Sequence, residues 1–219
     1  MSLTSLRARL IEHLEPAAGW TAGRAAVRSD FDLNPEAERP ERTLRPAAVL
    51  IPVIAGADGA TVLMTRRSDS LASHTGQIAF PGGRLDPGET AVEAALREAF
   101  EEVALDPALV EVLGVGDAYE TGTGFLVTPV VGWLTATPAT EAAPDEVAEV
   151  FEVPWDYIMD PDNHRRDSYD REGQPRRWYW AITHEERYIW GVTAGIVRAL
   201  RTRLYGEDVR ADMVAEDAA

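Results

Sequence analysis

The sequence contains no cysteine and no lysine. Without cysteine the chain has no thiol nucleophile, no disulfide framework and no cysteine-ligated zinc site. All 21 basic residues are arginines, which excludes a phosphate-binding lysine of the P-loop type and a Schiff-base lysine. Positive charge for an anionic substrate must therefore come from arginine, from a metal ion or from backbone N–H groups.

Positive charge is also scarce, and long apolar runs are missing. The 37 acidic residues outnumber the bases and leave a net charge of −16, which repels nucleic-acid backbones and anionic membranes. No apolar run approaches the roughly 20 residues that cross a bilayer. The segment from Met1 to Leu14 is amphipathic and contains an acidic residue, unlike a signal peptide. We therefore expect a cytoplasmic protein that binds neither nucleic acid nor a membrane.

The length and composition suit one domain with a full core. The chain has 219 residues, of which 45% are hydrophobic, and domains commonly span roughly 100–200 residues. Leucines recur at helical spacing up to Leu14, and Pro16 ends that run. We predict an N-terminal helix and arm packed on the domain over residues 1–45, a core domain over 46–205 and an acidic, frayed tail over 206–219.

Apolar runs separated by turn residues predict both strands and helices. The expected strands cover residues 47–54, 61–65, 110–115, 125–134 and 147–153, with a hairpin at 178–182 and 187–190. The expected helices cover residues 90–104 and 192–204. Strands mixed with a few helices predict an α/β (α+β) fold in which a mixed sheet is sandwiched between helices.

The helix expected over 90–104 has an apolar stripe and an acidic face. The stripe, which should pack on the sheet, consists of Val92, Ala95, Leu96, Ala99 and Val103. At about 100° per residue, Glu98, Glu101 and Glu102 gather on a different face. Like charges at the i,i+4 spacing of Glu98 and Glu102 destabilise a helix by roughly a few tenths of a kcal/mol. A divalent cation would neutralise them.

The residues around these glutamates are consistent with a metal site. A ligand set made only of oxygen favours Mg²⁺ or Mn²⁺ over zinc. Arg97 can orient a carboxylate of the cluster. Gly82 and Gly83 precede the helix and let the backbone approach a metal or a phosphate closely. For the glutamates alone, an ordinary solvated helix face remains the alternative.

The spacing of these residues resembles the Nudix signature. Gly83 is followed after five residues by Glu89, and after seven more by the run Arg97-Glu98-Ala99-Phe100-Glu101-Glu102-Val103-Ala104-Leu105. The likeness extends over 23 residues with many fixed positions. One position departs from it: Ala104 replaces a glycine that helps to end the helix, so the turn there is expected to shift.

The resemblance implies roles for individual residues. It makes Glu98 and Glu102 the principal metal ligands, with Glu101 sharing and the carbonyl of Gly82 as a further ligand. Glu89 supports the site, and Glu98, Arg97 and Glu101 form the expected catalytic set. The family's general base is a glutamate, for which Glu98 is the first candidate. Two later acids, Glu146 and Glu149, could also approach the site or lie on the surface.

The preceding segment also resembles the coenzyme A pyrophosphatase branch of the Nudix enzymes. Residues 63–83 carry the likeness, together with the runs at 125–131, 151–154 and 189–194. It implies hydrolysis of CoA or a CoA derivative to 3′,5′-ADP and 4′-phosphopantetheine. The implied substrate-binding residues are Arg66, Arg67, His74, Gln77 and Gly83. For the two arginines a surface ion pair remains an alternative, and for His74 a structural role does.

Other functions remain open at this stage. Ala72 stands where the branch usually has an arginine, so the substrate could be another nucleoside diphosphate derivative, such as a dinucleotide, NADH or a nucleotide sugar. A non-catalytic Nudix domain that senses a nucleotide is a further alternative. The arginines and aromatic residues between 165 and 179 predict a loop near the substrate or at a subunit interface, so a homodimer is left open.

Overall fold

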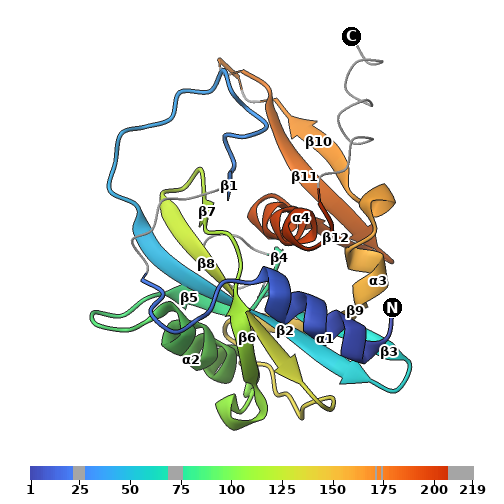
Figure 1. Ribbon diagram of the computed structural model, residues 1–219. Helices are drawn as coiled ribbons and strands as arrows, with labels where there is room; N and C mark the ends of the chain where they lie inside the picture. The colour runs from blue at the N-terminus through green and yellow to red at the C-terminus, as the bar shows by residue number, and fades with distance from the viewer. Residues whose placement is uncertain (22–27, 69–75, 171, 174, 207–219) are drawn as a thin grey trace.

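The computed structural model describes residues 1–21, 28–68, 76–170, 172–173 and 175–206, and its strands form two sheets packed with helices (Figure 1). The α-helices are α1 (Leu3–His13), α2 (Ala91–Val103), α3 (Trp155–Ile158) and α4 (Val192–Tyr205), with 3-10 turns at Pro107–Leu109 and Pro161–Asn163. The strands are β1 (Arg28–Ser29), β2 (Arg45–Gly56), β3 (Gly59–Arg67), β4 (Ile78–Ala79), β5 (Gly82–Arg84), β6 (Glu111–Val115), β7 (Tyr119–Glu120), β8 (Phe125–Leu134), β9 (Val147–Pro154), β10 (Arg165–Tyr169), β11 (Arg177–His184) and β12 (Arg187–Trp190).

The larger sheet is mixed, as predicted. Its strands run in the order β1-β7-β8-β2-β3-β4, while β5 pairs with β2, β6 with β8 and β9 with β3. The long central strands β2 and β8 are parallel, from Arg45 beside Phe125 to Ile54 beside Leu134. The turn at residues 56–59 then reverses the chain, so β2 and β3 form the predicted antiparallel hairpin. Both central strands are apolar because both of their faces are covered.

The side chains of β2 alternate between two layers of core. Leu50 and Ile54 pack in a cluster with the buried face of α2, whereas Ile51 and Val53 pack in a cluster with α1 and α4. This alternation is the period-two pattern of a strand buried on both sides. The sheet is therefore sandwiched between helices, as expected. The smaller sheet β10-β11-β12 covers α4 on its far side (Figure 1).

Helix α2 has well-defined ends close to those predicted from its periodicity. Thr90 caps its N-terminus through a reciprocal capping box with Glu93. At the other end Ala104 adopts the left-handed conformation with φ 54° and ψ 27°, and its N–H bonds the carbonyls of Ala99 and Phe100. The expected shift of this turn is therefore wrong, because alanine takes the left-handed conformation that glycine would adopt at lower cost.

The N-terminal segment packs against the rest of the chain. Leu6 and Leu10 of α1 are buried, and the backbone of Glu15 pairs with that of Val115. Further along, β1 joins the larger sheet beside β7. The first long strand of that sheet, β2, begins at Arg45, but the division into an arm and a domain stays a prediction. The predicted frayed tail lies outside the described residues, apart from Gly206.

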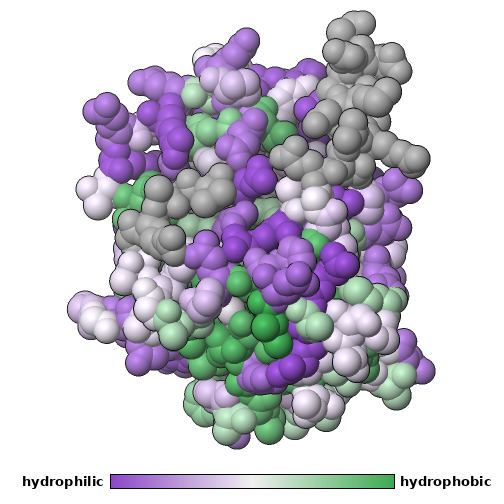
Figure 2. Space-filling model, viewed as in Figure 1, coloured by the Kyte–Doolittle hydropathy of each residue, from purple (hydrophilic) through white to green (hydrophobic). Residues whose placement is uncertain are grey.

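The surface is largely polar. Hydrophilic residues dominate the upper part of the face in Figure 2, and apolar residues gather below its centre. None of the helices in the described parts of the chain combines the length and apolar character needed to span a membrane. The basic segment around Arg165 was predicted as a loop, which is wrong: it forms β10 against β11. The strand lies at the edge of the smaller sheet, and its residues are polar apart from Tyr169, which suits an exposed edge.

Candidate active site

Two glycines bring a strand close to the helix that carries the glutamates. Gly82 lies opposite Val49 where β5 pairs with β2, and a Cβ at Gly82 would overlap the carbonyl oxygen of Ala48. A Cβ at Gly83 would overlap the carboxylate of Glu98. Gly82 therefore requires glycine for close approach to the backbone, and a side chain at Gly83 would displace the carboxylate of Glu98. The carboxylate of Glu98 therefore lies directly against the backbone of β5 at Gly83.

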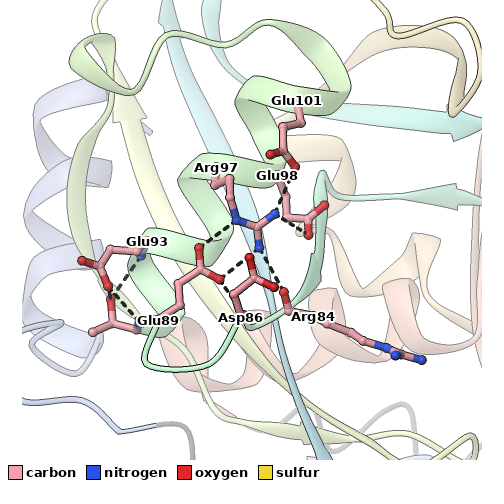
Figure 3. A network of polar contacts seen from close by, with 8 residues as sticks. Arg84, Asp86, Glu89, Glu93, Arg97, Glu98 and Glu101 are labelled. Carbon is pink, nitrogen blue, oxygen red and sulfur yellow. Dashed lines mark hydrogen bonds and ion pairs between the residues drawn. The ribbon is translucent and has the colours of Figure 1, made fainter.

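The guanidinium group of Arg97 holds the neighbouring carboxylates in place (Figure 3). Its Nε and Nη2 donate to the two oxygens of Glu89 at 2.8 and 3.0 Å. Its Nη1 donates to Glu98 at 2.9 Å and to Glu101 at 3.0 Å. The planar fork of arginine matches such paired carboxylates. Arg97 thus has the orienting contacts predicted for it.

The same network closes the loop between β5 and α2. Nη2 of Arg97 also donates to the carbonyl of Arg84 at 3.1 Å, and Glu89 accepts from the backbone N–H of Asp86 at 2.8 Å (Figure 3). Hydrogen bonding to Arg97 lowers the pKa of Glu89, and the carboxylates in turn raise the pKa of Arg97. Glu89 is therefore a charged support for the loop and for Arg97.

Glu98 and Glu102 are the poorly solvated carboxylates of the site. Glu102 is only 4% exposed; burial, together with the charge of Glu98, raises its pKa to about 7. The backbone of Gly82 hydrogen-bonds Glu102, and Nη1 of Arg67 lies 3.9 Å away. Burial likewise raises the pKa of Glu98, against the opposing effect of Arg97. Two acids held close together in low dielectric favour a bound proton or a bound cation.

The three helix glutamates lie close together, but their face is not separate from the buried stripe of α2, contrary to the prediction. Glu102 follows Ala95 by seven residues and therefore falls on the buried stripe, whereas the side chain of Glu101 is 54% exposed. Glu98 lies between these two environments and touches Gly83. The predicted ligand set thus has one buried, one half-buried and one exposed member.

The donor chemistry fits a hard divalent cation. Every candidate ligand offers oxygen, which suits Mg²⁺ or Mn²⁺, and Glu98 lies in a space that a Cβ at Gly83 would fill. Within the described ranges, no three histidine or acidic side chains already stand at ligand spacing around one point. The guanidinium of Arg97 binds the carboxylates of Glu98 and Glu101. Their side chains would therefore have to rotate for oxygen atoms of both to bind one cation.

Of the residues predicted to bind substrate, Gly83 lies against Glu98, and Arg66 and Arg67 lie near other glutamates. Arg67 contacts Glu102, and its backbone N–H donates to the carbonyl of Gln77 at 2.9 Å. Arg66 lies 3.6 Å from Glu149. The structure thus places both arginines beside glutamates. His74 and Ala72 lie outside the described residues.

The two later acids have different surroundings. Glu146 is near enough that its charge contributes to raising the pKa of both Glu98 and Glu102. Glu149 instead pairs with Arg66 and, at 2.7 Å, with Arg187. Arg187 was missed by sequence reasoning because it lies far along the chain, with no local spacing that connects it to the signature. Of these acids, Glu146 is the one that belongs to the electrostatic environment of the site.

Comparisons with known proteins agree with this geometry. The family model described as "NUDIX domain" matches residues 44–172. A protein of Citrobacter koseri is 42% identical over 173 residues, covering 78% of this chain and 89% of that protein. One of Escherichia coli O7:K1 is 41% identical with the same coverage. Both are named an uncharacterized Nudix hydrolase, NudL.

Solved structures include a more distant likeness. A MutT/nudix family protein from Enterococcus faecalis is 16% identical, with a TM-score of 0.43, over 96% of this chain and 88% of that one. The family match and the NudL relatives identify the fold, and the signature residues lie together in the structure. The chain belongs to the Nudix family and is a hydrolase of the kind that acts on pyrophosphate bonds.

Proposed function

We propose that the chain is a divalent-metal-dependent pyrophosphohydrolase that cleaves CoA or CoA derivatives to 3′,5′-ADP and 4′-phosphopantetheine. The observation that carries the hydrolytic part is the pair Glu98 and Glu102, poorly solvated and pressed against the Gly82–Gly83 strand. The CoA part is supported by the residues between 63 and 83 that resemble the CoA pyrophosphatase branch, and by the position of Arg67 beside Glu102.

Glu98, Glu102, Glu101 and the carbonyl of Gly82 are the groups proposed to hold the metal. A bound Mg²⁺ or Mn²⁺ would neutralise the diphosphate and make water a stronger nucleophile. Family members generally use divalent metals. Arg97 fixes the orientation of Glu98 through its hydrogen bond of 2.9 Å. This hydrogen bond holds the carboxylate of Glu98 where it can bind the metal or accept a proton from water.

Glu98 remains the first candidate for the general base. Its burial raises its pKa, which makes it a stronger proton acceptor than a solvated carboxylate. Glu146 is the second candidate because its charge acts on both Glu98 and Glu102. Glu149 is less suited, since Arg66 and Arg187 both pair with its carboxylate.

Arg66 and Arg67 are proposed to bind phosphate oxygens of the substrate. Each lies at the end of β3, beside a glutamate that a bound anion would replace as its partner. In a chain of net charge −16, these arginines and the metal supply the local attraction that the surface as a whole lacks. We propose the same contact role for Gln77, Gly83 and His74.

A substrate panel tests the proposal directly. Purified protein with Mg²⁺ or Mn²⁺ is given CoA, acetyl-CoA, NADH and a dinucleoside polyphosphate, and the products are identified by mass spectrometry. We expect CoA or acetyl-CoA to be the best substrate and to yield 3′,5′-ADP together with the matching phosphopantetheine. A Glu98→Gln preparation made in the same way controls for contaminating hydrolases.

The other outcomes separate the competing functions. Turnover of NADH or a dinucleotide without turnover of CoA would assign a different nucleoside diphosphate substrate. Binding of these compounds without hydrolysis, under either metal, would indicate a nucleotide sensor. Both results would contradict the proposal.

A further inference from the structure

A cavity lies away from the helix glutamates. It has a volume of about 440 Å³, within the roughly 300–1,000 Å³ of small-molecule sites. Its walls come from distant parts of the chain: the segment after β1, the turn after β7, strands β10 and β11, and the junction between β12 and α4. We call it the aromatic cavity, after the residues Tyr169, Tyr179 and Trp190 that line it.

These three rings form a continuous wall. The centroids of Tyr169 and Tyr179 lie 6.0 Å apart, and those of Tyr179 and Trp190 lie 5.2 Å apart. The strand register places them on one face of the smaller sheet, because Tyr169 pairs with Arg177 and Trp190 pairs with Ala181. Tyr169 is 44% exposed. An aromatic wall of this kind suits a flat ligand that stacks on it.

Two polar residues that line the cavity, Asn34 and Asp30, are hydrogen-bonded to the protein. The amide of Asn34 donates to the carbonyls of Asp30 and Trp178 and accepts from the N–H of Trp178. The carboxylate of Asp30 accepts from the hydroxyl of Tyr119 at 3.0 Å and from the N–H of Gly122 at 2.6 Å. These bonds hold the N-terminal arm against β11 and the turn after β7. The walls are therefore preorganised, and the rings offer a surface for stacking.

The aromatic cavity is connected to the hydrolytic site by one arginine. Gln77 lines the cavity, and its carbonyl accepts from the backbone N–H of Arg67. The guanidinium of Arg67 in turn lies 3.9 Å from Glu102. The separation between this cavity-lining residue and the buried glutamate is thus spanned by one arginine residue and its two contacts. That separation is compatible with a nucleotide whose base and diphosphate occupy the two places.

A second contact couples the cavity to the glycine strand. Thr193, at the start of α4, lines the cavity and donates its hydroxyl to the carbonyl of Ile78 at 3.0 Å. Ile78 begins the segment that leads to Gly82 and Gly83. A ligand in the cavity therefore contacts elements that are bonded to the strand carrying the site.

We propose that the aromatic cavity binds the nucleobase of the diphosphate substrate, stacked on Tyr179 and Trp190. The inference rests on the proposed function, since it assigns one end of that substrate. The diphosphate belongs at Arg67 and the glutamates, because the cavity itself is lined by Asp30 and Glu38 against the single cation of Arg177. Recognition of the nucleoside end is thereby built by the N-terminal arm and the C-terminal sheet.

The test compares two substitutions at one position. Trp190→Leu removes the ring, whereas Trp190→Phe keeps an aromatic face, and circular dichroism and thermal melting verify that both variants fold. Binding of 3′,5′-ADP and of 4′-phosphopantetheine is measured by calorimetry. We expect Trp190→Leu to weaken binding of 3′,5′-ADP by roughly tenfold or more. Trp190→Phe should weaken it much less, and neither variant should change binding of 4′-phosphopantetheine.

A second pair of variants guards against a local folding defect. Tyr179→Leu and Tyr179→Phe should repeat the same contrast from the neighbouring strand. If Trp190→Leu and Tyr179→Leu both bind 3′,5′-ADP as tightly as the wild type, the proposal is overturned. Loss of 4′-phosphopantetheine binding in these variants would also overturn it, by assigning the cavity to the other end of the molecule. So would a wild-type protein that does not bind 3′,5′-ADP.

The binding measurements stay informative whatever the turnover experiments show. A protein that does not hydrolyse CoA, but loses 3′,5′-ADP binding in the leucine variants, would refute the CoA assignment and support the nucleobase site. A protein that hydrolyses CoA with unchanged 3′,5′-ADP binding in those variants would do the reverse.

Discussion

The glutamate site and the aromatic cavity differ in how the chain builds them. Gly82, Glu98 and Glu102 come from one strand–loop–helix unit, tied together by Arg97. The aromatic cavity is assembled from the N-terminal arm, a central turn and the C-terminal sheet. The first region offers charge and little apolar surface, whereas the second offers stacked rings. We infer that the local unit performs the chemistry and that the assembled region selects the substrate.

The two regions also differ in what holds them in shape. In the glutamate site, charged hydrogen bonds to one guanidinium orient three carboxylates. Around the aromatic cavity, Asn34 and Asp30 bond mostly to backbone groups of other segments. The charge-assisted hydrogen bonds lie within one unit and do not require contacts from distant segments, whereas the cavity depends on the packing of the whole fold. Substitutions should therefore separate chemistry from recognition.

The largest expected effect is at Glu98. Glu98→Gln removes the charge that touches Gly83 and should lower kcat by at least about a hundredfold, the usual scale for a group that positions a metal or a proton. Binding of 3′,5′-ADP at the aromatic cavity should be unchanged. The matched control is Glu93→Gln on the same helix, which retains the capping box. Normal turnover in a folded Glu98→Gln protein would refute the assignment.

Acid should lower the free energy of unfolding through His164, which lies beside the smaller sheet. His164 immediately precedes β10 and is buried, and burial lowers its pKa to about 4 from an ordinary 6.5. The stability that depends on a neutral His164 is fully present above pH 6.5 and is lost as the pH falls toward 4. In that range the unfolded chain binds a proton that the folded protein excludes. The free energy of unfolding should fall by about 2 kcal/mol between pH 6.5 and pH 5 from this residue alone.

Urea unfolding at several pH values measures this effect. His164→Gln keeps a donor for the carbonyl of Ile158, which Nε2 of His164 contacts at 2.7 Å. The variant should show a flatter pH dependence than the wild type over the same window. Parallel curves for the two proteins would show that His164 is not the titrating group.

The contacts of Arg97 predict a smaller but specific effect. Arg97→Lys keeps the charge, but lysine cannot span Glu89, Glu98 and Glu101 with one planar fork. We expect the Mn²⁺ concentration for half-maximal activity to rise about tenfold, the lower scale for a residue that orients metal ligands. Arg7→Lys, at an exposed ion pair with Glu111, serves as control. An unchanged metal dependence in Arg97→Lys would mean that the glutamates are oriented without it.

The smallest expected change is a gain in stability at the end of the local unit. Ala104 has a φ of 54°, so Ala104→Gly should raise the free energy of unfolding by up to about 1 kcal/mol by relieving Cβ strain. Ala8→Gly, inside α1 and exposed, should lower it by a similar amount. Both are measured by urea unfolding. A loss of stability in Ala104→Gly would contradict the strain.

Sequence reasoning succeeded where spacing along the chain decides the geometry. The helix expected over 90–104 is found at Ala91–Val103, and the hairpin expected near residues 178–190 is β11 with β12. It failed where burial decides. Glu102 is buried because α2 packs on β2 and β5, where the backbone of Gly82 hydrogen-bonds its carboxylate. The arginines around Arg165 form a strand because β11 pairs with them.

By itself the sequence determined the local unit: a glycine pair, a capped helix and glutamates at helical spacing, since torsion angles and side-chain periodicity act over only a few residues. The tertiary structure alone decided that Glu102 is desolvated and that the charge of Glu146 acts on Glu98 and Glu102. It also decided where the rings of Tyr169, Tyr179 and Trp190 come together. Desolvation and ring packing depend on neighbours that are remote in sequence, so no spacing along the chain encodes them.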